Sequence, residues 1–347
     1  MTPQLLQDFQ RLREANPTIR AVDAAQSLEV SEGELLEVRH GHGDVSRLAL
    51  RGSDFKALLE ALKGAGPVMT LTRNDAAVHE TTGPIETIEV HKAIGQITGE
   101  IDLRLFMSHW HAGYHVREQT KSGIRSSFQI FDIEGKSILK IFATDDTDPQ
   151  VWDRTARTFR DQTQAITAFS PPGAVTGDRP DEAIDVHELR ARWRTLSHSH
   201  DFFGMLRVLG VGRLQALRLA GVEFAQEIAP ASIQAMLEGA ADQNVPIMCF
   251  VGNKGCIQIF SGEIERIASV GPWLNVLDDR FNLHLRVDKI ASAWVVRKPT
   301  SSRGLITSIE VFNEQRDMVS QFFGERPPGG TERPAWRSLA EGLIAET

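Results

Sequence analysis

The chain has 347 residues, of which 41% are hydrophobic and 24% charged, and its formal net charge is −8. A single hydrophobic core rarely serves this length, so we expect two domains or one duplicated domain. The acidic balance argues against a nucleic-acid partner, and the lack of a long apolar run or apolar leader predicts no membrane insertion and a cytoplasmic protein.

The first helical pattern lies at 22–41 (VDAAQSLEVSEGELLEVRHG) and consists of two short helices joined by a turn. The segment 202–221 (FFGMLRVLGVGRLQALRLAG) has the same pattern, and both resemble helix-turn-helix DNA readers. Glu32, Glu34 and Glu37 stand where a recognition helix needs basic residues, which supply most DNA affinity. A DNA-binding regulator is therefore only the remote alternative.

Three blocks of the chain recur in its second half. The matching pairs are 67–88 with 246–267, 100–118 with 279–298, and 126–142 with 307–323. Within them Met69 matches Met248, Arg117 matches Arg297 and Phe131 matches Phe312, at separations of 179, 180 and 181 positions. One such match would mean little, but three in order indicate a duplicated unit.

Each repeat opens with short amphipathic helices and continues with alternating runs, such as FNLHLRV and ITSIEVF, that predict half-buried strands. Turn sequences such as DIEG and FNEQRD join these strands as hairpins. This order predicts an α+β fold, a tandem duplication of a helix plus antiparallel-sheet unit, with two large antiparallel sheets and flanking helices. We expect a first repeat at 1–169, a linker at 170–182, a second repeat at 183–330, and a tail at 331–347 that lies outside the fold.

Two further sets of residues carry side chains that can bind metals. His109, His111 and His115 are evenly spaced in MSHWHAGYH, which places them on one face of a predicted strand. Three imidazoles can bind a transition metal, but no carboxylate lies nearby, and we favour a solvent-facing strand edge. Cys249 and Cys256 form neither a CxxC pair nor a zinc set, and we expect them as small apolar residues of a buried hairpin.

The segment richest in chemistry is LSHSHDFFGMLRVLGVGRLQALRLAG at 196–221, with His200 at the start of a predicted helix. The helix boundaries are expected at Ser199 as N-cap, Gly210 or Gly212 at the break, and Gly221 at the end. The apolar residues at helical spacing are Phe203, Leu206 and Leu209. A neutral imidazole beside apolar surface suits iron in a flat apolar ligand, whereas the plainer alternative is a capping or solvated histidine.

Taken together, these segments resemble the cytoplasmic haem-utilisation family, the haemin-degrading factors HemS, ChuS and HmuS. The resemblance runs from about ANPTIRAVDAAQSL to FFGERPPG, nearly the whole chain, and that family is itself a tandem duplication. Its ordered blocks are VMTLTRNDAAVHE, GEIDLRLFMSHW, HDFFGMLRVLGVGRLQALRLA, FNLHLRVDKIASAWVVRKPT and ITSIEVFNEQRDMVSQFFGERPPG.

The resemblance implies a haem site. It places the proximal iron ligand on His200, with His198 as the alternative, and Arg104 on the distal side of the iron; His200 and Arg104 would be the catalytic residues. Haem contacts are implied for Phe106, Arg213, Phe250, Lys298, Gln321 and Arg326, with Arg213 and Lys298 at the propionates. Haem needs this division, with an imidazole for iron, cations for carboxylates and apolar side chains for the ring.

The chain departs from the family pattern in its last strand. Relatives carry two tyrosines where this chain has Ser320 and Phe323, and its single tyrosine, Tyr114, lies in the other half. Two polar contacts near the haem edge are therefore missing, while the iron ligand and the basic pair remain. His284 stands opposite Arg104 in the repeat, and we interpret it as structural.

The resemblance implies a protein of bacterial haem uptake that degrades haem by oxidative ring opening, with an external electron donor, and so releases iron. The alternative is a haem chaperone that delivers haem to a separate oxygenase without turnover. Besides haem, the partners implied are a haem-uptake transporter or a haem oxygenase. Both functions need the same iron ligand and cations, so the sequence leaves both open.

Overall fold

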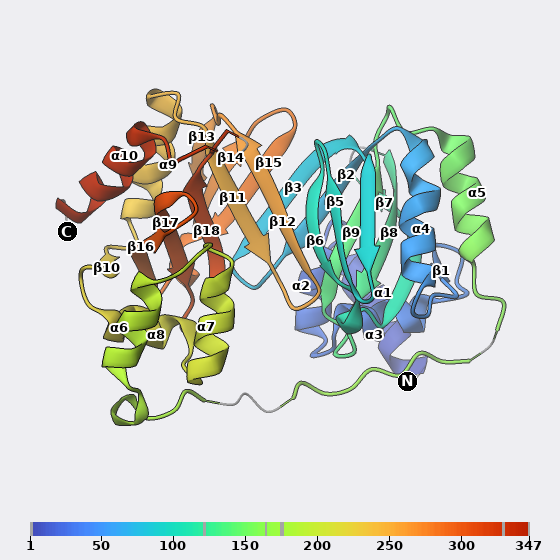
Figure 1. Cartoon of the computed structure of the whole chain (residues 1–347). Coiled ribbons are helices and arrows are strands. Elements are labelled where there is room, and N and C mark those ends of the chain that lie inside the picture. Colours follow the sequence, from blue (N-terminus) through green and yellow to red (C-terminus); the bar gives the residue numbers. More distant parts are fainter. Residues whose placement is uncertain (1–2, 121–122, 164, 174–176, 328–329, 346–347) are drawn as a thin grey trace. The chain divides into compact units, whose positions relative to one another are not determined.

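The α+β duplication is confirmed. The computed structural model describes residues 3–120, 123–163, 165–173, 177–327 and 330–345 (Figure 1). Over these residues, each half of the chain forms five α-helices and nine strands in the same order. The strands belong to two antiparallel sheets of nine strands each.

The first half begins with three short helices, adds a strand and a fourth helix, and then forms eight strands and a last helix. Its helices are α1 (Pro3–Ala15), α2 (Ala21–Ser27), α3 (Glu32–Arg39), α4 (Asp54–Leu62) and α5 (Pro149–Phe159). Its strands are β1 (Val45–Arg47), β2 (Pro67–Arg73), β3 (Ala77–Pro84), β4 (Thr87–His91), β5 (Ile94–Thr98), β6 (Asp102–Phe106), β7 (Ala112–Thr120), β8 (Gly123–Phe131) and β9 (Ser137–Ala143).

The second half repeats this order element by element. Its helices are α6 (Val186–Arg194), α7 (Asp201–Leu209), α8 (Arg213–Ala220), α9 (Ser232–Asp242) and α10 (Pro334–Ala345). Its strands are β10 (Ala225–Ile228), β11 (Ile247–Gly252), β12 (Cys256–Gly262), β13 (Ile267–Val270), β14 (Trp273–Leu277), β15 (Phe281–Arg286), β16 (Ser292–Thr300), β17 (Gly304–Phe312) and β18 (Met318–Gly324).

Strand order is also repeated. The first-half strands form the runs β1-β7-β8-β9-β2-β3 and β6-β5-β4, and the second-half strands form β10-β16-β17-β18-β11-β12 and β15-β14-β13. The duplication extends to irregularities, because the register shifts between Ile130 and Phe131 in β8 and between Val311 and Phe312 in β17. Matching bulges at matching positions indicate that the backbone itself was duplicated.

The chain folds into two compact units, and each unit includes a short segment from the other half of the sequence. Unit 1 comprises 1–73, 79–173 and 252–258, and unit 2 comprises the remainder, including 74–78. In unit 1 the Asn253 side chain accepts hydrogen bonds from the N–H groups of Gly255 and Cys256 and donates to the carbonyl of Ile138 at 2.9 Å. In unit 2 Asn74 makes the matching turn and donates to the carbonyl of Val319 at 2.8 Å.

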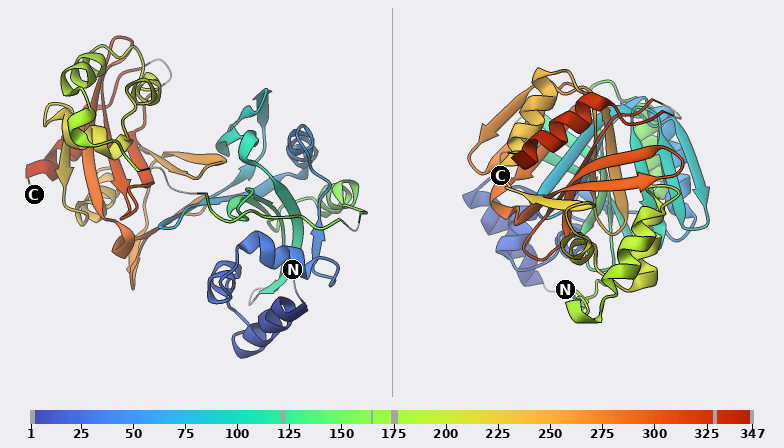
Figure 2. Two further views of the ribbon diagram at one scale, coloured as in Figure 1. Left: turned by 90° about the horizontal axis from the view of Figure 1, so that it is seen from below. Right: turned by 60° about the vertical axis from the view of Figure 1, so that its left-hand side comes forward.

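Unit 2 has a hydrophobic core on each face of its strands. Helices α9 and α10 lie side by side on one face, where Ile233 and Met236 pack with Val295 and Ile309 (Figures 1 and 2). Helices α6 to α8 cover the other face with a second cluster that includes Trp193, Phe202, Trp294 and Phe312. Unit 1 is built in the same way, with α4 and α5 packed on one cluster and α3 on another.

The expectation that the tail lies outside the fold is wrong for 334–345. These residues form α10, whose Trp336 is fully buried and donates its indole N–H to the carbonyl of Thr307 at 3.0 Å. The proline- and glycine-rich stretch before it gave no local sign of this packing. Cys249 and Cys256 are buried free cysteines, as expected. In the part of the chain that the structure describes, no helix is long and apolar enough to cross a membrane.

Two hairpin turns require a left-handed residue in both copies, although only one copy of each uses glycine. Lys92 between β4 and β5 has φ 55°, and Gly271 between β13 and β14 has φ 56°. Gly135 and Arg316 form a second such pair, with φ 73° and 68°. A side chain in this region is strained by about 1–2 kcal/mol, because its Cβ approaches the following carbonyl oxygen.

Replacing Lys92 therefore tests the turn. Lys92→Gly is expected to be more stable than Lys92→Ala by about 0.5–1 kcal/mol, the strain relieved less the greater entropy of an unfolded glycine. Thermal or urea unfolding of the two variants measures the difference. Gly271→Ala should lose stability by a similar amount, and equal stability of Lys92→Gly and Lys92→Ala would contradict the assignment.

Candidate functional site

Helix α7 places His200 at its exposed N-terminal end. His200, rather than the predicted Ser199, is the N-cap, and its side chain makes no capping hydrogen bond. The carboxylate of Asp201 instead accepts from the N–H of His198 at 2.8 Å and holds the turn before the helix. The helix ends at Gly210, whose φ of 59° is left-handed, as expected.

The buried side of α7 differs from the prediction. Phe202, Met205 and Leu206 are buried, whereas Phe203 is 69% exposed. Leu206 belongs to both the predicted and the observed stripe, but the buried face is turned toward Phe202, because Phe202 packs against Trp193 of α6 with 4.5 Å between ring centroids. His200 thus lies on an exposed surface next to an unpaired phenylalanine ring.

His198 is also exposed, but its ring is engaged. Its Nδ1 lies 2.9 Å from Oγ of Ser302, and the hydroxyl of Ser302 donates to the carbonyl of Ser197 at 2.7 Å. A histidine normally binds haem iron through Nε2 and makes a hydrogen bond through Nδ1, so this contact is compatible with iron ligation. The local geometry therefore leaves both His198 and His200 as candidate ligands, and the His200 side chain makes no capping hydrogen bond.

Arg213 and Lys298, both predicted to meet carboxylates, already meet one in the protein. Nε and Nη2 of Arg213 donate to the two oxygens of Glu310, each at 2.7 Å. Nζ of Lys298 donates to Oε1 of Glu310 at 2.7 Å and to the hydroxyl of Ser308 at 3.1 Å. Glu310 and Lys298 are buried, and the Arg213 side chain is 25% exposed. We call Arg213, Glu310 and Lys298 the charged triad.

Burial and pairing shift the proton affinities of this triad. Burial lowers the pKa of Lys298 to about 8, since desolvation and the nearby Arg213 outweigh the attraction of Glu310. Burial alone would raise the pKa of Glu310, but the charges and hydrogen bonds of Arg213 and Lys298 hold it well below its usual range. At neutral pH the triad thus holds two cations and one carboxylate.

The triad lies on a face of unit 2 that also carries aromatic rings. Nζ of Lys298 lies 4.9 Å from the ring centre of Phe202 and 5.8 Å from that of Phe323. Phe323 in turn meets Phe250 edge-on, with 5.2 Å between centroids. The structure therefore places Arg213, Lys298 and Phe250 on one face of unit 2.

Gln321 completes a row of residues across four strands. Trp294, Glu310, Gln321 and Phe250 are successive cross-strand partners on β16, β17, β18 and β11, so their side chains share one face. The indole N–H of Trp294 and the amide nitrogen of Gln321 are buried and have no partner among the described residues, and neither has Nη1 of Arg326. Unpaired buried donors beside a cation pair fit an acidic ligand with a flat ring.

The other predicted residues belong to unit 1. Arg104 on β6 forms an ion pair with Asp102, two residues before it, and its side chain is 37% exposed. Burial raises the pKa of Asp102 despite this pairing. Phe106 is half-buried at the end of β6, where its N–H donates to the carbonyl of Gly255 at 2.9 Å.

Glu310 is the residue that sequence analysis missed. The run ITSIEVF was interpreted only as a strand, because a glutamate at an alternating position looks like a solvent-facing residue. In the structure residues 306–312 are all buried, so both faces of β17 are covered. A single glutamate among apolar residues was the signal in the sequence that this position is buried. Its partners could not be recognised, because they lie up to 97 positions away.

The histidine segment of unit 1 is not a strand edge. Residues 107–109 form a short 3-10 helix, and β7 begins only at Ala112, so His109 and His111 lie before it. His115 is buried, its Nε2 lies 2.9 Å from the hydroxyl of Ser126, and burial lowers its pKa to about 4. No group of three or more metal-binding side chains occurs among the residues that the structure describes.

On the corresponding face of unit 1 one carboxylate also pairs with two cations. Buried Lys140, which the repeat aligns with Gln321, donates to Glu32 at 2.7 Å, and Glu32 also pairs with Arg73. In the same unit Glu37 accepts a hydrogen bond of 2.7 Å from the hydroxyl of Tyr114, the protein's single tyrosine. In unit 2 His284 bonds Asn275 through Nδ1 at 2.7 Å, which agrees with a structural role.

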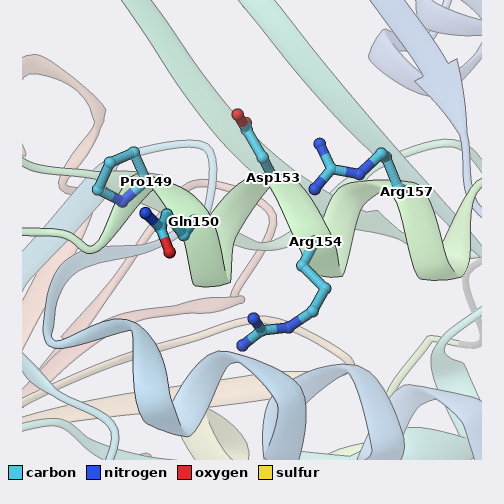
Figure 3. A pocket seen from close by; sticks show the side chains of 5 residues that line it. All are labelled: Pro149, Gln150, Asp153, Arg154 and Arg157. Carbon is cyan, nitrogen blue, oxygen red and sulfur yellow. The ribbon is translucent and has the colours of Figure 1, made fainter.

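Two open hollows of unit 1 lack the chemistry of the triad face. One of about 370 Å³ lies along α5 and is lined by Pro149, Gln150, Asp153, Arg154 and Arg157, which project in different directions from one helix (Figure 3). Another of about 670 Å³ lies against α1 in unit 1. Neither contains a residue implied by the resemblance.

Comparison with known proteins gives one family. Residues 29–159 and 210–343 match the haemin-degrading HemS.ChuX domain. The hemin transport protein HmuS of Yersinia pestis is 35% identical over 99% of this chain and 98% of its own length. Holo-PhuS, a heme-binding protein from Pseudomonas aeruginosa, is 40% identical with a TM-score of 0.94 over 99% of each chain. The heme degrading enzyme ChuS of Escherichia coli O157:H7 is 32% identical with a TM-score of 0.91 over 98% of this chain and 99% of its own.

The two domain matches fall one in each half of the sequence, in agreement with the repeated order of helices and strands. The relatives match over nearly their full length, so the likeness covers both repeats. The chain belongs to the HemS/ChuS/HmuS family of proteins built from the haemin-degrading HemS.ChuX domain.

Proposed function

We propose that this chain binds haem on the face of unit 2 that carries the charged triad, with the iron ligated by His200. The observation that carries the proposal is the exposed imidazole at the start of α7, two residues before Phe202, whose ring lies beneath Lys298. An uncommitted imidazole, two cations and half-buried aromatic rings are the three kinds of group that haem requires. The heme-binding relative PhuS supports this assignment.

We further propose that haem is degraded by oxidative ring opening, with electrons from an external donor. The relative ChuS is described as a heme degrading enzyme, which favours turnover over transport alone. Arg104 is the chain's candidate for stabilising charge during the reaction, although Asp102 shares its guanidinium in unit 1. The alternative is a chaperone that passes haem from an uptake transporter to a separate oxygenase, and ring opening in the presence of catalase separates the two.

The first test concerns the iron ligand. His200→Ala is expected to abolish the spectrum of histidine-ligated iron and to weaken haem binding more than tenfold, because its imidazole makes the bond to iron. Absorption titration and resonance Raman spectroscopy measure both effects. His198→Ala is the matched control and should keep the wild-type spectrum; the reverse pattern would make His198 the ligand.

The second test uses the lowered pKa of Lys298. Haem affinity should be constant below about pH 7 and fall severalfold between pH 7 and 9.5, because loss of the Lys298 proton, whose pKa is about 8, removes one of the two cations that attract the propionates. Lys298→Arg should remove this pH dependence, since a guanidinium stays charged throughout the range. Affinity that falls equally in wild type and variant would exclude Lys298 as the titrating group.

The third test separates degradation from transport. With reductant, air and catalase, the haem complex should lose its Soret band and yield an opened tetrapyrrole. Arg104→Ala should slow this loss more than tenfold with little change in affinity, since an electrostatic group of this kind contributes about 2–4 kcal/mol. Asp102→Asn is the matched variant and should retain activity, because it frees Arg104. If catalase abolishes ring opening, the chaperone function holds, and if Arg104→Ala opens the ring as fast as wild type, Arg104 takes no part in turnover.

A further inference from the structure

Arg213 and Lys298 bind the carboxylate of Glu310 as they would bind the carboxylate of a ligand. Oε1 of Glu310 accepts hydrogen bonds from Nη2 of Arg213, Nζ of Lys298 and the hydroxyl of Ser308, and its Oε2 accepts from Nε of Arg213. The side chain is fully buried. A carboxylate of a ligand bound at the same site would make the same contacts, two hydrogen bonds with the guanidinium and one with the ammonium group.

The groups around the triad leave Glu310 as its counter-charge. On β18 and β11 the neighbours in the row are neutral Gln321 and Phe250. On α7 the charged side chains, Asp201 and Arg207, are exposed, and the first turn of α8 contains no acidic residue. One carboxylate therefore faces two cations, and a single positive charge remains.

We propose that Glu310 is a specificity-determining residue that competes with the ligand's own carboxylates for Arg213 and Lys298. The inference rests on the proposed haem site in unit 2. Glu310 uses two donors of Arg213, and Ser308 and Glu310 use two of the three N–H donors of Lys298. A porphyrin carboxylate then shares cations that are already paired, so its charge adds little to affinity and haem remains easy to release.

A purely structural role would have different consequences. Two buried cations without an acid would be costly, so Glu310 could simply hold them in place. In that case removing its charge would disorganise Arg213 and Lys298 and weaken the binding of ionised carboxylates. If Glu310 competes, removing its charge strengthens that binding. The sign of the change separates the two roles.

The experiment compares haem with haem dimethyl ester, whose carboxylates carry no charge. Wild type should bind haem less than tenfold more tightly than the ester, and Glu310→Gln should increase this ratio at least tenfold, mainly by slowing haem dissociation. Glu341→Gln is the matched control. It also removes a carboxylate paired with an arginine, Arg297, whose neighbour Lys298 points to the opposite face of β16, and it should leave the ratio unchanged.

The measured ratios either support the inference or overturn it. A ratio that stays constant or falls in Glu310→Gln overturns the inference while the haem site stands, provided that wild type shows the His200-dependent spectrum. A wild-type ratio well above tenfold overturns it as well and requires no variant, so the inference can be overturned even if Glu310→Gln folds poorly. If wild type binds no haem, the proposed function itself fails, and this inference fails with it.

Discussion

Burial of both faces of the central strands is the constraint on which the rest of unit 2 depends. Residues 306–312 of β17 are all buried, so each face of this strand requires a cover. Helices α9 and α10 supply one cover and α6 to α8 the other. A charge on such a strand has no access to water, and it persists only when other groups pair with it. Glu310 meets this condition through Arg213 and Lys298.

The same constraint has a different solution in unit 1. There the paired groups are Lys140 with Glu32 and Arg73, and burial lowers the pKa of Lys140 to about 7. The helix that supplies Glu32, α3, is held by a capping box in which Ser31 and Glu34 satisfy each other's backbone groups. Duplication thus preserved the backbone and its bulges, while the charged residues stand at different positions in the two copies.

These differences bear on chemistry. Beside the charged residues of unit 2 lie half-buried rings and buried donors that lack partners among the described residues, and α7 begins at the exposed imidazole of His200. A ligand that brings a metal, a flat ring and carboxylates would satisfy all of these groups at once. In unit 1 Glu32 pairs with two cations, Lys140 and Arg73, as Glu310 does with Arg213 and Lys298 in unit 2. The two faces of the duplicated scaffold therefore share one balance of charge, and the exposed imidazole of His200 belongs to unit 2.

The amino-acid sequence by itself determined the repeat, the strands, the hairpins and the paired short helices, because alternation, helical spacing and turn residues act over a few positions. It also indicated Arg213, Lys298 and Phe250 as neighbours, through resemblance. Tertiary structure decided the burial of Phe202 in place of Phe203, the packing of Trp336 in what looked like a tail, and the pairing of Glu310. Each depends on groups tens of positions away: Trp336 bonds Thr307 at a separation of 29, and Glu310 bonds Arg213 at a separation of 97. The residues next to each position in the sequence do not indicate such partners, since a contact between distant segments forms only when the sheet brings them together.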